Sequence, residues 1–122
     1  MPGILRLRAR GRVRSPKGEM NKLERRFVDE ILEPKRLAGL VLWYAYEAVK
    51  LRLAKGLFLD IDFLVVQKDL SLECYDVKAR WSNGQVGEED ARAKLKMAGE
   101  KFPFRVLAAV WDRKTGWNYE EF

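Results

Sequence analysis

The sequence of 122 residues contains no histidine and only one cysteine, Cys74. The absence of histidine excludes Ser-His-Asp triads, Cys-His pairs, histidine general bases and histidine metal sites. A lone cysteine excludes a disulfide within the chain and fits a reducing compartment. Any hydrolytic chemistry must therefore use carboxylates, lysine, tyrosine or a metal held by oxygen ligands.

Long hydrophobic runs are also missing. No stretch approaches the ~20 consecutive apolar residues that a membrane-spanning helix needs. The arginine-rich beginning of the chain has no apolar segment of the kind found in secretory signals. We therefore expect no membrane partner and a cytoplasmic location, in a bacterial, phage-infected or archaeal cell.

Positive charge is in excess, and it is unevenly distributed. The net charge is +6; residues 1–56 hold 14 Lys/Arg and 6 Asp/Glu, whereas residues 57–122 hold 10 and 12. This pattern favours a polyanionic partner together with a site that needs carboxylates. Residues 1–18 form a basic arm, which we expect to be extended or flexible and to contact nucleic acid; a solubilising tail or an edge strand is the alternative. Its basic residues are Arg6, Arg8, Arg10, Arg12, Arg14 and Lys17.

The remaining residues, 19–122, are expected to form a single domain with two helices and several strands. Leu23, Phe27 and Ile31 recur every four residues, which predicts a helix over 19–33 that Pro34 ends. A second helix is expected over 88–102. Apolar runs predict strands at 40–49, 50–54, 57–66, 70–79, 104–111 and 117–122. The expected fold class is mixed α/β (α+β), a central mixed sheet flanked by helices.

Two neighbouring strands carry charged residues on faces that are otherwise apolar. Alternation places Asp60 and Asp62 on one face of the run 57–66, and Asp76 and Lys78 on one face of the run 70–79. If the two runs form a hairpin that turns about Asp69, then Val66 faces Leu72 and Leu64 faces Cys74. The same register places Asp62 opposite Asp76, and Asp60 opposite Lys78.

Facing carboxylates on a semi-apolar sheet repel each other, and a divalent cation between them removes the repulsion. Mg²⁺ suits such a site, because proteins usually hold it with one or two carboxylates, waters and substrate phosphate. Lys78 could position the attacking water or stabilise charge on a phosphate, and Glu24 of the first helix could add a third carboxylate. The alternative is that Asp62, Asp76 and Lys78 form a structural cluster of ion pairs.

The spacing acid-x-Lys is a weak signal by itself, because it occurs three times in the chain. The other two matches begin at Glu33 and Asp112, at a predicted helix end and a predicted turn. Only Asp76-Val77-Lys78 ends an apolar strand that follows another acid-bearing strand. Further basic residues near this strand end could bind phosphate or simply form a solvated surface. These are Arg80, Arg92, Lys94 and Lys96.

Three segments, "DIDFLVV", "YDVKARW" and "DARAKLKMAGEKFP", resemble the PD-(D/E)xK nuclease superfamily, and most of all its small phage-type endonucleases, which include junction-resolving enzymes. The resemblance covers residues 19–122. It implies a restriction-endonuclease-like core, dependence on Mg²⁺ or Mn²⁺, and hydrolysis of DNA phosphodiester bonds. Ile61 replaces the usual proline, Asp76 the commoner glutamate and Ala79 a frequent glycine.

By position, the resemblance implies that Asp62 and Asp76 are metal-binding acids, Lys78 is the catalytic lysine and Glu24 is the helix glutamate. Val77 is a further expected metal-binding position. Asp60 remains an alternative first acid, and Glu47 could be a partner on a strand. We therefore expect an Mg²⁺-dependent endodeoxyribonuclease that acts on double-stranded or branched DNA such as a Holliday junction, with a homodimer needed to cut two strands. The alternative is a non-catalytic nucleic-acid-binding protein with a nuclease-like fold.

Overall fold

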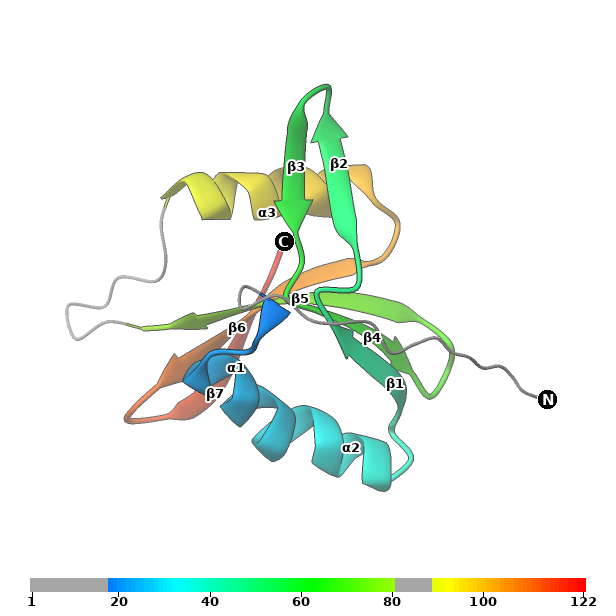
Figure 1. The fold of residues 1–122 in the computed structure, drawn as a ribbon, viewed down its shortest axis with the longest axis vertical. Coiled ribbons are helices and arrows are strands. Elements are labelled where there is room, and N and C mark those ends of the chain that lie inside the picture. The colour runs from blue at the N-terminus through cyan, green and yellow to red at the C-terminus, as the bar shows by residue number, and fades with distance from the viewer. Residues whose placement is uncertain (1–17, 81–88) are drawn as a thin grey trace.

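A computed structural model of the chain describes residues 18–80 and 89–122. Its centre is a five-stranded mixed sheet in the order β1-β4-β5-β6-β7, in which β5 and β6 are parallel and the other neighbours are antiparallel. A two-stranded hairpin, β2-β3, forms a separate small sheet that is not hydrogen-bonded to the large one (Figure 1). The strands of the large sheet are β1 (Val41–Tyr46), β4 (Phe63–Gln67), β5 (Leu72–Ala79), β6 (Arg105–Asp112) and β7 (Gly116–Glu121). The fold is mixed α+β, which confirms the expected class.

Each face of the sheet buries its own hydrophobic cluster. On one face, Phe27 and Leu32 of the first helical run pack against Phe63, Val65 and other sheet residues. The other face is covered by the hairpin of β2 (Lys50–Ala54) and β3 (Leu57–Asp60) and by α3 (Glu89–Lys101). Figure 1 shows this arrangement, with α1 and α2 on one side of the sheet and α3 with the hairpin on the other. The predicted helix over 88–102 is thus confirmed as α3, which buries Leu95 and Ala98.

The first helical run does not end at Pro34 as the sequence predicted. It continues from α1 (Lys22–Phe27) through a π-helical turn, η3 (Val28–Leu32), into α2 (Glu33–Leu37). The N–H of Glu33 donates to the carbonyl of Val28, five residues back, and Pro34 follows at once in the first turn of α2. A proline ring normally clashes with the carbonyl four residues before it, and the wider π turn moves the preceding carbonyls. Ile31 packs against the core as expected, although it is only partly buried, and the extra residue in this turn also buries Leu32.

The predicted strand over 57–66 is divided into two strands that belong to different sheets. Its odd residues do not share one face: Leu59 and Ile61 join the cluster beneath α3, whereas Phe63 and Val65 join the cluster beneath α1 and α2. The chain turns at Ile61 and Asp62, between β3 and β4, to place these apolar residues in separate cores. Asp60 therefore leaves the large sheet, and the expectation that it faces Lys78 is wrong.

The pairing of β4 with β5 confirms the predicted register. Leu64 lies opposite Cys74, and Val66 lies opposite Leu72. The carboxylate of Asp69 accepts hydrogen bonds from the N–H and hydroxyl of Ser71, and Leu70 adopts a φ of 73°, so the turn forms where it was expected. Continued by one residue beyond β4, the same register brings Asp62 beside Asp76.

Candidate functional site

The backbone around Asp62 is fixed by two connections to the segment after β1. The N–H of Glu47 donates to the carbonyl of Asp62 over 2.8 Å, and the N–H of Ile61 donates to the carbonyl of Val49 over 3.4 Å. Glu47 itself is exposed and has a φ of 50° just beyond β1. Its structural contribution is thus a backbone contact in a turn, and the expectation of a strand position for Glu47 is wrong.

Beyond the end of β4, the side chain of Asp62 accepts a backbone hydrogen bond from β5 that a neighbouring strand would otherwise accept. Its Oδ2 accepts a hydrogen bond from the backbone N–H of Val77 over 2.8 Å, at the point where β4 has ended. The N–H and C=O of one strand residue point to the same edge, so the carbonyl of Val77 also faces this gap. One side-chain carboxyl and one main-chain carbonyl therefore meet at the end of β4.

Asp76 and Lys78 complete the cluster from the next strand. Lys78 Nζ lies 2.6 Å from Asp76 Oδ2, and their side chains are 13% and 17% exposed, respectively. This exposure is low for a lysine and an aspartate, which are rarely buried without a partner. The carboxyl of Asp76 lies beside that of Asp62, close enough for its charge to act on Asp62. The structure thus brings together Asp62, Asp76, Val77 and Lys78, as the sequence predicted.

The pKa of Asp62 is raised to about 8, chiefly because burial penalises its charged form and because the negative charge of Asp76 lies beside it. The hydrogen bond from Val77 opposes this change but does not cancel it, and the charge of Glu24 adds to the increase. At neutral pH the Asp62 carboxyl therefore keeps a proton, which it can donate to Asp76. Protonation of Asp62 relieves the repulsion between the two carboxylates, as a bound cation also would.

Glu24 does not join this cluster through a contact. It lies on α1, is 7% exposed, and its Oε1 accepts hydrogen bonds from the N–H of Asn21 (2.9 Å) and the hydroxyl of Tyr46 (3.0 Å). Asn21 in turn caps the N–H of Glu24, so the two residues form a capping box. The same environment raises the pKa of Tyr46 through burial and through Glu24. Glu24 acts on Asp62 through its charge, and its contacts are those of a helix cap.

Asp60 is separated from the cluster. Its side chain is 74% exposed and lies 3.7 Å from Lys50 across the β2-β3 hairpin. The alternative in which Asp60 supplies the first acid therefore finds no support in the fold.

The predicted phosphate-binding residues have different positions. Arg6, Arg8, Arg10, Arg12, Arg14 and Lys17 lie outside the described residues. Arg80 forms an ion pair with Asp112, and Arg92 binds both carboxylate oxygens of Glu120. Lys94 and Lys96 lie on α3, where Lys96 is exposed and Lys94 is half-buried. Because Arg80 and Arg92 are each paired with an acid, their positive charge is less available to a phosphate.

Within residues 18–80 and 89–122, no group of three or more His, Cys, Asp or Glu side chains is placed to hold a metal ion. The donor set that is present consists of two carboxylates and one carbonyl. All are hard oxygen donors of the kind that Mg²⁺ and Mn²⁺ prefer, and Mg²⁺ is commonly held by one or two carboxylates with the remaining positions taken by water and phosphate.

Comparisons with family models, with curated proteins and with solved structures found no match to this chain. In the described part of the chain, no helix is long and apolar enough to cross a membrane.

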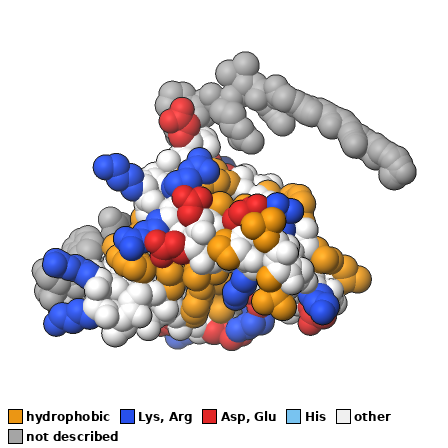
Figure 2. All heavy atoms as spheres, turned by 90° about the horizontal axis from the view of Figure 1, so that it is seen from below, with side chains coloured by type: hydrophobic (Ala, Val, Ile, Leu, Met, Phe, Trp, Pro, Cys, Tyr) orange, Lys and Arg blue, Asp and Glu red, His pale blue; other side chains and the backbone are white. Residues whose placement is uncertain are grey.

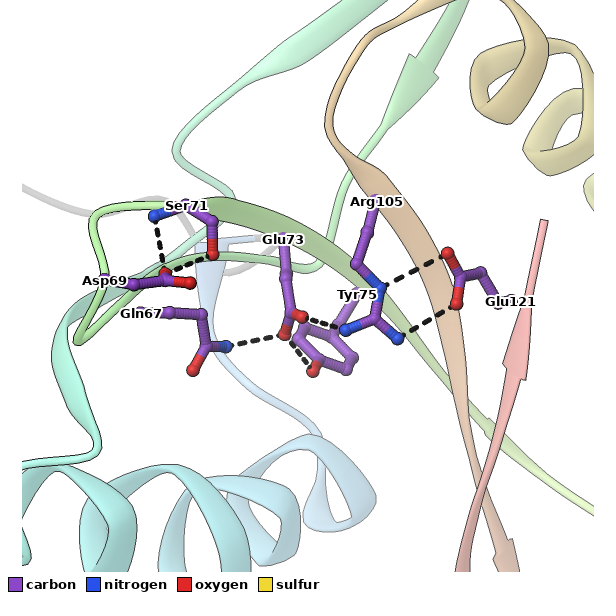
Figure 3. Close-up of polar contacts among 7 residues, drawn as sticks. All are labelled: Gln67, Asp69, Ser71, Glu73, Tyr75, Arg105 and Glu121. Carbon is purple, nitrogen blue, oxygen red and sulfur yellow. Dashed lines mark hydrogen bonds and ion pairs between the residues drawn. The ribbon is translucent and has the colours of Figure 1, made fainter.

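Another acid, Glu73, is buried near the opposite end of β5, and the sequence pattern did not predict its cluster. Glu73 is 5% exposed, and three donors surround its carboxylate: Gln67 Nε2 (2.6 Å), the Tyr75 hydroxyl (2.5 Å) and Arg105 Nη1 (2.5 Å). Figure 3 shows these side chains converging on Glu73 from β4, β5 and β6, with Arg105 also held by Glu121. The sequence did contain one signal: Glu73 lies on the same face of β5 as Tyr75 and Val77, which both pack against the core.

Proposed function

We propose that the protein is a metal-dependent endodeoxyribonuclease whose site consists of Asp62, Asp76, Val77 and Lys78. The observation that supports this proposal is the pair of neighbouring carboxylates, Asp62 and Asp76, with an amine 2.6 Å from Asp76 and the Val77 N–H 2.8 Å from Asp62, at a strand end. Buried like charges are unfavourable, and perturbed carboxylates of this kind cluster at functional sites. The resemblance to PD-(D/E)xK nucleases supports the same assignment.

Each residue has a defined role in this proposal. Asp62, Asp76 and the carbonyl of Val77 would hold Mg²⁺ or Mn²⁺, which supplies charge neutralisation at the phosphate and lowers the pKa of water. Lys78 orients the attacking water or stabilises the charge that develops on the phosphodiester. Glu24 adjusts the electrostatic potential at Asp62 from the N-terminal turn of α1. The resemblance implies products with 5′-phosphate and 3′-hydroxyl ends.

The decisive experiment incubates the protein with a supercoiled plasmid and with a four-way DNA junction, in Mg²⁺, in Mn²⁺ or in EDTA. Cleavage that requires the metal is expected in the first two conditions. Asp76→Asn and Lys78→Ala should each reduce the cleavage rate at least 100-fold while DNA binding persists. Asp29→Asn is the matched control, because it removes an exposed carboxylate of η3, away from both proposed DNA contacts, and should leave the rate within twofold. An absence of metal-dependent cleavage at any protein concentration would refute the proposal.

The second candidate function is that of a DNA-binding protein without nuclease activity. The observation that favours it is the short ion pair between Lys78 and Asp76, which satisfies both charges without a metal. Calorimetric titration with Mn²⁺ separates the two candidates. The nuclease should bind Mn²⁺ at a site that Asp62→Asn and Asp76→Asn each abolish, whereas the non-catalytic protein should show no such site.

A further inference from the structure

The β2-β3 hairpin has an inner apolar face and an outer face that carries cations and an aromatic ring. Leu51, Leu53 and Leu59 are buried against the cluster beneath α3. The residues between them point the other way. These are Lys50 and Arg52 of β2, with Phe58 and Asp60 of β3 opposite them.

The outer face combines positive charge with an exposed ring. Arg52 lies opposite Phe58 in the hairpin, and Lys50 Nζ lies 5.8 Å from the centre of the Phe58 ring. Phe58 is 42% exposed, although the core beneath the same hairpin accommodates three leucines. A large aromatic side chain that remains at the surface between two cations has the composition of a stacking platform for a nucleic-acid base.

A basic hollow of about 460 Å³ adjoins this face, between β2 and the C-terminal end of α3. Four cations line it, and its lining contains no acid: the cations are Lys50, Arg52, Lys55 and Lys101. Lys101 Nζ donates to the carbonyl of Leu53 over 3.4 Å, which ties the end of α3 to β2. The hollow thus complements a negative ligand, and the five residues of β2 extend about 17 Å, a length that covers about five nucleotides of one strand of a duplex.

The face of the molecule that α1 and α2 form has a different charge pattern. There, Arg26 pairs with Glu30 and Arg36 pairs with Glu33. Figure 2, which views the molecule from the side of these helices, shows blue and red side chains interspersed with hydrophobic ones. On the hairpin, by contrast, only Asp60 offsets the three cations of residues 50–60, so this surface is the better match for a polyanion.

We propose that the outer face of the β2-β3 hairpin and the adjoining hollow bind a DNA strand. Lys50, Arg52, Lys55 and Lys101 contact its phosphates, and Phe58 stacks on an unpaired base. This inference rests on the proposed function for the identity of the nucleic acid. Asp62 follows β3 by two residues, so a strand bound along the hairpin leads directly to the candidate site.

The first test measures binding to fluorescently labelled DNA by anisotropy, in EDTA so that cleavage does not enter. The full chain is compared with the triple variant Lys50→Ala, Arg52→Ala and Lys55→Ala over a range of NaCl concentrations. The slope of log affinity against log salt should become about 2–3 smaller in magnitude, because each phosphate contact contributes about 0.9. The matched control is Lys22→Ala with Lys35→Ala on the α1-α2 face, and its slope should fall by less than 1. An unchanged slope in the triple variant, or an equal loss in the control, would overturn the inference.

The second test concerns the ring. Phe58→Ala should weaken binding to a DNA with a single-stranded flank about tenfold and leave binding to a blunt duplex unchanged, whereas Phe58→Trp should retain tight binding. Trp43→Ala is the control for loss of an exposed aromatic side chain, since Trp43 is 47% exposed on β1. Equal losses on flanked and blunt DNA would refute stacking, and preferential binding of RNA of the same sequence would refute DNA as the ligand.

A gain of binding offers an independent check that does not depend on a destabilising change. Asp60→Asn removes the one acid of the outer face and frees Lys50, so DNA affinity should rise two- to fivefold at low salt. A fall in affinity would contradict the inference. Because all of these measurements read binding, salt-dependent binding by a protein that never cleaves would refute only the nuclease proposal. Cleavage that survives unaltered in the hairpin variants, with unaltered binding, would refute only the hairpin surface.

Discussion

Two acidic clusters lie along strand β5, a buried one around Glu73 and a half-buried one formed by Asp62 and Asp76, and they differ in how well their charges are satisfied. Glu73, at the beginning of the strand, receives hydrogen bonds from an amide, a phenol and a guanidinium. Among the described residues, Asp62 and Asp76, beside the other end, have one backbone N–H and one lysine amine between two carboxylates. The pKa of Asp62 is consequently raised to about 8 by burial and by Asp76.

The difference separates a structural acid from a candidate functional one. A buried carboxylate with a full set of donors has no need of a ligand, because its desolvation is already compensated. Two carboxylates that must share a proton are compensated only in part, and a cation of higher charge would compensate them better. The Glu73 cluster therefore stabilises the fold, whereas the Asp62–Asp76 cluster stores an unfavourable interaction that metal binding would relieve.

The largest expected effect comes from breaking the satisfied cluster. Glu73→Ala leaves Arg105 and the donors of Gln67 and Tyr75 without their common acceptor. The free energy of unfolding should fall by about 3–5 kcal/mol, because the side-chain donors of Gln67 and Tyr75 lose their acceptor; Arg105, which is 53% exposed, can turn to water. Urea denaturation followed by circular dichroism measures this change. Glu121→Ala removes the exposed partner of the same arginine and should lower the free energy of unfolding by no more than about 1 kcal/mol; a similar loss in both variants would show that Glu73 is not the centre of the cluster.

Removing the charge of Asp62 is expected to raise the free energy of unfolding instead of lowering it. The pKa of its carboxyl is near 4 in the unfolded chain and about 8 in the folded protein, so the folded state binds more protons between these values. The free energy of unfolding of the wild type should therefore decrease as the pH rises from 4 to 8. Asp62→Asn keeps an oxygen for the Val77 N–H and has no charge, so it should be nearly as stable as the wild type at pH 4, and its advantage should grow by about 1.4 kcal/mol per pH unit up to pH 8.

Thermal unfolding in metal-free buffers across this pH range measures the difference. Asp60→Asn is the control, because its exposed carboxyl should give no such pH-dependent gain. A stability advantage of Asp62→Asn that does not grow with pH would contradict the assignment of a shared proton to the Asp62–Asp76 pair.

A smaller effect is expected from a metal. If Mg²⁺ or Mn²⁺ replaces the shared proton, addition of the ion at ten times its dissociation constant should stabilise the folded protein by about 1.4 kcal/mol. The increase in melting temperature should be greater at pH 8 than at pH 6, because binding displaces the proton of Asp62. Differential scanning fluorimetry with and without EDTA provides the measurement. Asp76→Asn should remove the increase, and an increase that persists in this variant would place the metal elsewhere.

These contrasts also explain how far the sequence could predict the molecule. The sequence predicted that Leu64 lies opposite Cys74, because two alternating runs are separated by a short turn at Asp69. Both the alternation and the turn are local signals. The meeting of Asp62, Asp76 and Lys78 followed from the same register. The bend at Ile61 could not be predicted, because the odd residues of "LFLDIDFLVV" are apolar from end to end and its halves differ only in which core each one fills. For the same reason the sequence could not choose between Asp60 and Asp62.

The continuation of the first helical run past Pro34 could not be predicted from the sequence either. A proline after a helical pattern usually marks its end, and nothing in the residues before it announces the π turn of η3. Glu73 was missed for a different reason: its partners Gln67 and Arg105 come from two other strands. Their convergence depends on the strand order β4-β5-β6, which alternation alone does not provide.

The smallest effect tests whether Glu73 has more hydrogen-bond donors than its burial requires. Tyr75→Phe removes the hydroxyl that donates to Glu73 over 2.5 Å and leaves the ring in the core, where it contacts Phe27. Glu73 keeps Gln67 and Arg105, so the free energy of unfolding should fall by only about 1 kcal/mol, the net value of one hydrogen bond. Tyr119→Phe is the control, because the hydroxyl of this half-exposed residue makes no hydrogen bond within the described residues. A loss above about 3 kcal/mol in Tyr75→Phe would mean that Glu73 tolerates no missing donor. Its cluster would then be as finely balanced as the Asp62–Asp76 pair, and the number of donors would no longer distinguish a structural acid from a functional one.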